Sequence, residues 1–115
     1  MMRGQKIIDI IVVGRVSVWA NPPYEAPWKN KITEAVKPIT ESPPKNCSIR
    51  LQFYISEERL TAGNDVDNLA KPVLDALKVA GAIVDDPFVF NLDVTKFPAT
   101  DEEKVHIELW QWITH

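Results

Sequence analysis

Apolar and polar residues alternate along three segments of the chain, which is the pattern of a strand with one buried face. The clearest segment is 48–55, and its apolar positions are Ile49, Leu51, Phe53 and Ile55. Weaker alternations over 90–94 and 105–109 predict two further strands, which we expect to form a hairpin across residues 98–103. An apolar run near the amino terminus predicts a first strand from Lys6 to about Trp19, bent at Gly14 and ended by Pro22-Pro23.

Two other segments show apolar residues three to four positions apart, as in amphipathic helices. The first runs from Trp28 to Val36, with Pro27 suited to its first turn and Pro38 ending it. The second lies between the aspartates at 67 and 85, and Gly81 fits the left-handed position that ends a helix.

The second helix raises two further expectations. Pro72 removes a backbone hydrogen bond from the helix interior, so we expect the helix to begin later or to kink, leaving peptide groups around Asn68 free. If the chain then turns back, Ala82 to Val84 form a short strand.

The predicted order is β-α-β-α-β-β, and we expect one α+β domain over residues 1–115, with a mixed sheet of about four strands and two helices. Hydrophobic residues make up 45% and charged residues 25%, which is typical of a globular domain, and no apolar run reaches membrane-spanning length. The single cysteine, Cys47, excludes an internal disulfide and is compatible with the reducing cytoplasm. We therefore expect a cytoplasmic protein without a membrane partner.

Carboxylates are concentrated at both ends of the second helix. Asp65 and Asp67 lie at its start, with Lys71 one turn further on, and Asp85-Asp86 follow its end. Two like charges about 4 Å apart repel by about 4 kcal/mol at a surface-like dielectric, so clustered carboxylates need a metal, a lysine or a proton. Oxygen ligands favour magnesium or manganese over zinc. The alternative is that an aspartate of the first pair only caps the helix and that the second pair is an ordinary turn.

The spacing of the two acidic pairs sets a geometric condition. A helix of this length separates its ends by roughly 20 Å. Either a returning strand runs back along the helix before Asp85, or the acidic groups meet across a subunit or sheet edge.

The segment that carries these residues resembles the core of the RusA family of Holliday junction resolvases. The resemblance covers residues 64–98, with weaker agreement in the loop around 21–23, and rests on Asp65-Val66-Asp67-Asn68-Leu69-Ala70-Lys71, Leu74-Asp75-Ala76-Leu77, Ala80-Gly81, Asp85-Asp86 and Val94-Thr95-Lys96-Phe97-Pro98. It implies a RusA-like fold and a magnesium-dependent homodimer, with manganese as a substitute ion, that nicks branched DNA such as four-way junctions symmetrically. Carried over by position, the catalytic residues are Asp65, Asp67, Asp86 and Lys71, and Asp85 joins the three aspartates as a metal ligand.

The distribution of charge departs from that of a typical DNA-binding protein. The net charge is −3, whereas DNA affinity comes largely from neutralised phosphates. The loop before the first aspartate pair, residues 57–64, contains one arginine where family members often have a basic cluster. The basic residues that we expect to contact DNA are Lys29, Lys31, Lys71 and Lys78.

A second interpretation belongs to a different functional class. The chain could be a catalytically weak or inactive dimeric DNA-binding or scaffold protein with the same fold. Trp110 and Trp112, on one face of the last strand, would then form a dimer surface or stack on exposed bases, although such residues are more often packed within the protein.

Overall fold

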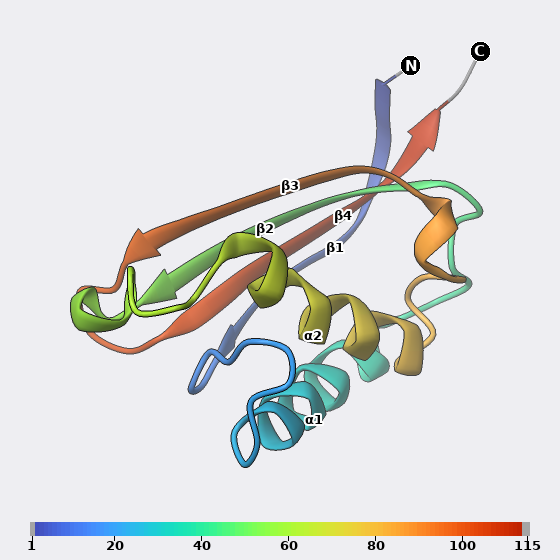
Figure 1. Ribbon diagram of the computed structural model, residues 1–115. Coiled ribbons are helices and arrows are strands. Elements are labelled where there is room, and N and C mark those ends of the chain that lie inside the picture. Colours follow the sequence, from blue (N-terminus) through green and yellow to red (C-terminus); the bar gives the residue numbers. More distant parts are fainter. Residues whose placement is uncertain (1, 114–115) are drawn as a thin grey trace.

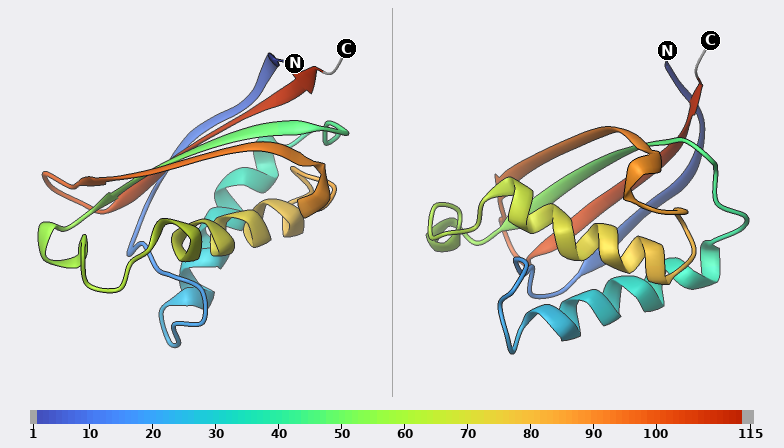
Figure 2. Two further views of the ribbon diagram at one scale, coloured as in Figure 1. Left: turned by 45° about the horizontal axis from the view of Figure 1, so that its top comes forward. Right: turned by 45° about the vertical axis from the view of Figure 1, so that its right-hand side comes forward.

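Residues 2–113, which the computed structural model describes, form a four-stranded sheet with two helices on one face (Figures 1 and 2). The elements are β1 (Met2–Val13), α1 (Glu25–Val36), β2 (Cys47–Ile55), α2 (Val66–Val79), β3 (Val89–Pro98) and β4 (Lys104–Ile113). Short 3₁₀ turns occupy Lys37–Ile39 (η1), Glu57–Arg59 (η2) and Asp86–Phe88 (η3). This order in a mixed sheet confirms the predicted α+β fold class, and no helix in this range is long and apolar enough to cross a membrane.

The strands lie in the order β1-β4-β2-β3. β4 is antiparallel to both β1 and β2, whereas β3 pairs with β2 alone and runs parallel to it. The predicted hairpin of the last two strands is therefore wrong, because β2 lies between β3 and β4. Alternation of apolar residues decides which face of a strand is buried, but it contains no information about which strand is its neighbour.

β1 begins and ends earlier than the sequence pattern predicts. It runs from Met2 to Val13, and the chain leaves the sheet at Gly14, whose N–H donates to the carbonyl of Glu103 (3.1 Å). A β-carbon at Gly14 would lie 3.1 Å from the ring of Trp28, so a larger residue here would require that ring to shift by a few tenths of an ångström. The predicted bend at residue 14 is thus the end of the strand and the start of the loop 14–24.

α2 ends as predicted, but the chain does not return as a strand. Gly81 has a φ of +80°, its N–H donates to Lys78 (3.0 Å), and the N–H of Ala82 donates to Leu77 (2.9 Å). This is the Schellman arrangement that closes many helices. Residues 82–84 form a turn rather than the predicted strand, because the buried side chains of Ala82 and Ile83 draw the chain into the core and then toward η3.

Pro72 lies inside α2, which begins at Val66, so the predicted late start of the helix is wrong. Because proline has no N–H, the carbonyl of Asn68 loses its helical partner. The backbone N–H of Trp19 donates to that carbonyl instead (3.0 Å). The missing helical bond is thus replaced by one that joins the loop 14–24 to α2.

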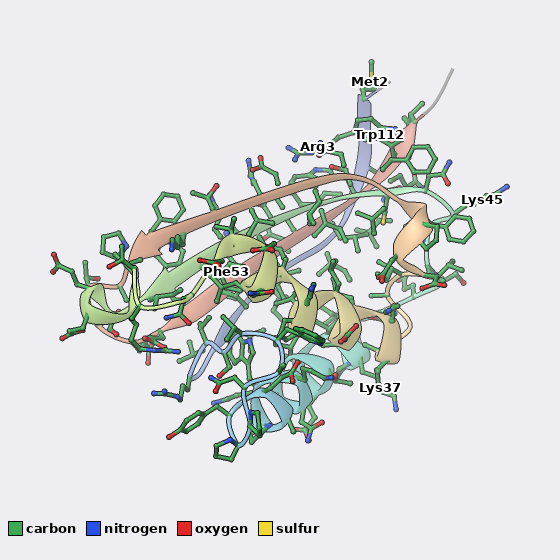
Figure 3. The ribbon with its side chains drawn as sticks, in the orientation of Figure 1. Met2, Arg3, Lys37, Lys45, Phe53 and Trp112 are labelled. Atoms are coloured by element: carbon green, nitrogen blue, oxygen red, sulfur yellow. The ribbon has the colours of Figure 1, made fainter. Side chains whose placement is uncertain are left out.

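The core lies between the sheet and the two helices, and Phe53 of β2 is fully buried in it (Figure 3). Alternate residues of β2 are fully buried there, as the sequence pattern predicts: Ile49, Leu51, Phe53 and Ile55. The helices contribute Trp28, Ile32 and Val36 from α1 and Leu69, Val73 and Leu77 from α2. The opposite face of the sheet carries no helix.

We expect Phe53→Ala to lower the free energy of unfolding by about 3–5 kcal/mol, because a buried ring is lost and a cavity remains. Ile11→Ala is the control, since that side chain is 55% exposed and its removal should cost about 1 kcal/mol or less. Urea denaturation followed by circular dichroism measures both. Equal losses in the two variants would contradict this placement of the core.

Candidate active site

Asp65 and Asp67 lie at the amino-terminal end of α2 with exposed side chains. Asp65 occupies the N-cap position, yet its carboxylate accepts no capping hydrogen bond. Within residues 2–113 neither carboxylate forms a salt bridge. A helix amino terminus carries partial positive charge, which favours carboxylates there. The capping alternative therefore does not account for the side chain of Asp65, and both carboxylates are available for a ligand.

Lys71 lies on the same face of α2 as Asp67, four residues further along. Its ammonium group is above the ring of Trp19, 4.5 Å from the ring centroid. The ring therefore holds the cation beside the aspartates. Sequence periodicity gives no signal for Trp19, because it belongs to a loop and contacts α2 through the bond to the Asn68 carbonyl and through Lys71.

A second contact holds the loop 57–64 that precedes the aspartates. The ammonium group of Lys96, on β3, donates to the carbonyl oxygens of Leu60 and Asn64, the latter at 3.0 Å. The side chain of Asn64 in turn donates to the carbonyl of Arg59 (2.6 Å). Hydrogen bonds to a charged donor are stronger than neutral ones, so Lys96 fixes the backbone from which α2 starts. This role depends on the path of the loop and has no sequence signal of its own.

An apolar groove of about 460 Å³ lies beside Asp67 and Lys71. It lies between the first half of α2 and the edge strand β3. Its lining is Val66, Asp67, Ala70, Lys71, Leu74, Leu92 and Val94. Val66 and Leu92 are exposed, so the groove is an open apolar surface next to two charged side chains.

Asp85 and Asp86 lie at the opposite end of α2 from the first aspartate pair (Figure 1). The carboxylate of Asp85 accepts the N–H of Asp86 (2.8 Å) and caps η3. Lys78 lies 3.3 Å from Asp86 and 3.5 Å from Asp75. Burial opposes the charge of Lys78, but these carboxylates outweigh it and raise its pKa. One protomer therefore does not bring the two acidic pairs together.

Lys29 and Lys31 do not form one basic patch. They are two residues apart in α1, so their side chains point about 200° apart around the helix axis. Lys29 lies 3.7 Å from Asp75 of α2. Lys31 is exposed and lines a shallow hollow with Arg15 and Tyr24.

One group of three possible metal ligands occurs within residues 2–113, on the uncovered face of the sheet: Asp9, His106 and Glu108, with ligand atoms within 4.8 Å of one another. Glu108 is buried, and its carboxylate lies 2.7 Å from both Lys6 and Arg50. Burial opposes its ionisation, but the two cations outweigh burial and lower its pKa. The hydrogen bond from His106 (2.6 Å) is the main cause of the lowered pKa of Asp9. This network is already neutralised by its own cations and needs no metal.

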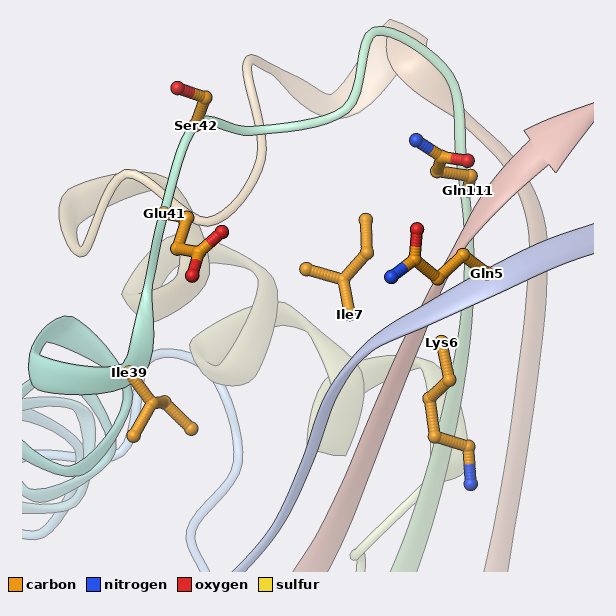
Figure 4. Close-up of a pocket in the computed structure, with 7 residues that line it drawn as sticks. All are labelled: Gln5, Lys6, Ile7, Ile39, Glu41, Ser42 and Gln111. Carbon is orange, nitrogen blue, oxygen red and sulfur yellow. The ribbon is translucent and has the colours of Figure 1, made fainter.

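A further hollow, of about 280 Å³, lies between β1 and the segment after α1 (Figure 4). Its lining is Gln5, Lys6, Ile7, Ile39, Glu41, Ser42 and Gln111, and none of the predicted site residues is among them. Ile7 points into the hollow, whereas Lys6 points away from it, toward its partner Glu108 (2.7 Å). This hollow is therefore a weaker candidate for an active site than the group formed by Asp65, Asp67 and Lys71.

Comparison with known proteins gives one family. The family model described as Endodeoxyribonuclease RusA matches residues 13–110, which include both helices, the loop 14–24 and both acidic pairs. No curated protein matches the chain. The match confirms the resemblance drawn from the segment 64–98 and extends it over most of the fold.

The Glu108 network predicts a pH dependence of stability. A carboxyl group with a lowered pKa in the folded state contributes stability above its unfolded pKa and loses it as the pH falls through the folded pKa. We expect Glu108→Gln to be less stable than the unmodified protein at about pH 7, with the difference shrinking toward about pH 3. Thermal unfolding over this range measures it, with the exposed Glu34→Gln as control. A Glu108 effect independent of pH would contradict the ion-pair account.

Proposed function

We propose that this chain, which belongs to the RusA family of endodeoxyribonucleases, is a structure-selective nuclease that cuts branched DNA such as four-way junctions. One observation carries the proposal. Asp65, Asp67 and Lys71 are gathered on the first turns of α2, where two exposed carboxylates lack cationic partners within residues 2–113. Such a group suits hydrolysis of a phosphodiester, which needs an activated water and neutralisation of phosphate charge.

The donor set fits magnesium or manganese. Asp65 and Asp67 offer only carboxylate oxygens, which these ions prefer, and neither has an ion-pair partner in the described part of the chain. When bound, a divalent ion would lower the pKa of the attacking water and neutralise a phosphate oxygen. The aspartates would hold that ion at the amino terminus of α2.

Lys71 has a separate role in this proposal. Its ammonium group is held by the ring of Trp19 rather than by a carboxylate, so it keeps its capacity to donate hydrogen bonds to a phosphate. There it would orient the scissile phosphate and stabilise the charge that develops in the transition state.

The acidic pairs are proposed to meet across a homodimer. Asp86 lies beyond the far end of a 14-residue helix, roughly 20 Å from Asp65, and no returning strand shortens that distance. If two copies pack with their α2 helices antiparallel, Asp85 and Asp86 of the partner subunit lie beside Asp65 and Asp67. Two-fold symmetry then produces two identical sites, as paired nicks require.

The open groove beside α2 supports this arrangement. It is lined mainly by apolar side chains, and Phe90, at the start of β3, is half exposed. An exposed apolar surface of this kind marks an interface more often than a solvated face. A partner packed there would cover the surface and would also approach Asp67 and Lys71.

We expect Asp65→Asn, Asp67→Asn, Asp86→Asn and Lys71→Ala each to slow magnesium-dependent cutting of a four-way junction by at least about 100-fold, because each removes a group that acts on the transition state. Junction affinity in metal-free buffer should change much less. Gel assays with labelled junction, fork and linear duplex measure cutting and binding separately.

Lys31→Ala and Lys29→Ala are the matched controls. They should weaken binding with a shallower salt dependence, while cutting at saturating protein persists. The exposed Lys31 should have the larger effect, since Lys29 is already near Asp75. An unmodified protein that binds junctions tightly yet never cuts them with magnesium or manganese would replace this proposal with the scaffold interpretation.

A further inference from the structure

Trp19 exposes a large apolar ring beside the proposed catalytic cluster. It is 51% exposed, and Lys71 approaches the ring at 4.5 Å from its centroid. An indole left in water at this position has a hydrophobic cost, which a flat apolar ligand would remove. The cation beside it favours a ligand that also carries negative charge.

The backbone around Trp19 is fixed before any ligand binds. Its N–H donates to Asn68, and the next N–H, of Ala20, donates to the carboxylate of Glu25 (3.1 Å). Ala20 has a φ of +58°, a left-handed conformation that is strained for a residue with a β-carbon. Strain of this kind persists where the surrounding structure enforces it, and it clusters at ligand sites. The loop thus holds the indole in one place at a conformational cost.

The loop that carries Trp19 has a second aromatic residue with a cation beside it. The guanidinium of Arg15 is 4.0 Å from the ring centroid of Tyr24, a second exposed aromatic residue of the same loop. Lys31 borders the same hollow as these two residues. The loop therefore presents aromatic rings together with cations, although the whole chain is acidic. Stacking on aromatic rings combined with contacts from cations to phosphates is how proteins hold unpaired nucleotides.

Trp110 of the last strand does not fit this role. The ring of Trp110 has Arg3, Lys6 and Arg50 within 4.1 to 5.4 Å of its centroid. It lies on the uncovered face of the sheet, opposite α2. The ring of Trp110 is therefore already covered by side chains of this chain. Among the described residues, the ring of Trp19 has one cation over it, Lys71.

We propose that Trp19 stacks on a nucleobase whose face is exposed at the branch point of the DNA and so sets the position of the scissile phosphate beside Lys71. The inference rests on the proposed function and adds a recognition contact to it. Paired bases in a linear duplex are stacked on their neighbours and offer no free face. The contact would therefore favour branched over linear DNA.

Binding in metal-free buffer tests the contact without cutting. Trp19→Ala should weaken binding to a synthetic four-way junction by about 5- to 150-fold, corresponding to 1–3 kcal/mol per stacked base, and should leave linear duplex binding nearly unchanged. Trp19→Phe keeps a ring and should stay within about threefold of the unmodified protein. It also serves as the conservative variant if the alanine variant does not fold.

Tryptophan fluorescence gives a second readout. A base quenches only the indole that stacks on it. Adding the junction should therefore quench the emission of the unmodified protein and of Trp110→Phe, but not that of Trp19→Phe. Trp110 is the matched control, as it is also flanked by cations but lies on the other face.

Several results would overturn the stacking contact. They are full junction affinity in Trp19→Ala, equal loss for junction and duplex, quenching that persists in Trp19→Phe, and a slower cutting rate at saturation with unchanged affinity. The last would make Trp19 a positioning residue for Lys71. Loss of dimerisation in Trp19→Ala would assign the ring to a subunit interface and also overturn the contact. If the unmodified protein binds no branched DNA, the proposed function fails as well, whereas normal binding and cutting by Trp19→Ala refutes the stacking alone.

Discussion

The parallel pairing of β2 and β3 is the constraint on which the rest of the structure depends. Parallel strands need a crossover, and α2 provides it. The chain leaves the sheet at the carboxyl end of β2 and enters it again at the amino end of β3, which lies at the opposite end of the strands. Asp65 and Asp67 lie near the carboxyl end of β2, and Asp85 and Asp86 lie near the amino end of β3. The separation of the acidic pairs therefore follows from the topology, and the proposed shared site between two copies would bring them together.

A backbone hydrogen bond joins the loop 14–24 to the first turn of α2. β1 and β2 are both antiparallel to β4, so the loops that follow them emerge on the same side of the sheet. The loop after β1 is attached to α2 through the N–H of Trp19 and the carbonyl of Asn68, which Pro72 leaves without a helical donor. Pro72, which is unfavourable in a helix, thus leaves a free carbonyl to which the backbone of Trp19 binds. The ring of Trp19 then contacts the ammonium group of Lys71.

Sequence reasoning predicts the elements better than their neighbours. The alternation in β2 and the glycine after α2 give correct elements, because each reflects local backbone geometry and burial. The hairpin of β3 with β4 fails because strand pairing is decided by the crossover and not by periodicity. Spacing and the family resemblance single out Asp65, Asp67 and Lys71 as candidate site residues, and their roles stay predictions. Trp19 and Lys96 are missed, since both act through contacts between segments far apart in the chain.

Mixing two inactive variants tests the shared site most directly. If Asp67 of one subunit works with Asp86 of the other, a heterodimer of Asp67→Asn and Asp86→Asn contains one fully intact site and one doubly defective site. An equal mixture, dissociated and reassociated, should then recover about a quarter of the intact sites and nick single strands of a four-way junction without paired cuts. If each site lies within one subunit, every site in the mixture is defective. A mixture as inactive as its two components, with heterodimers present, would contradict the account.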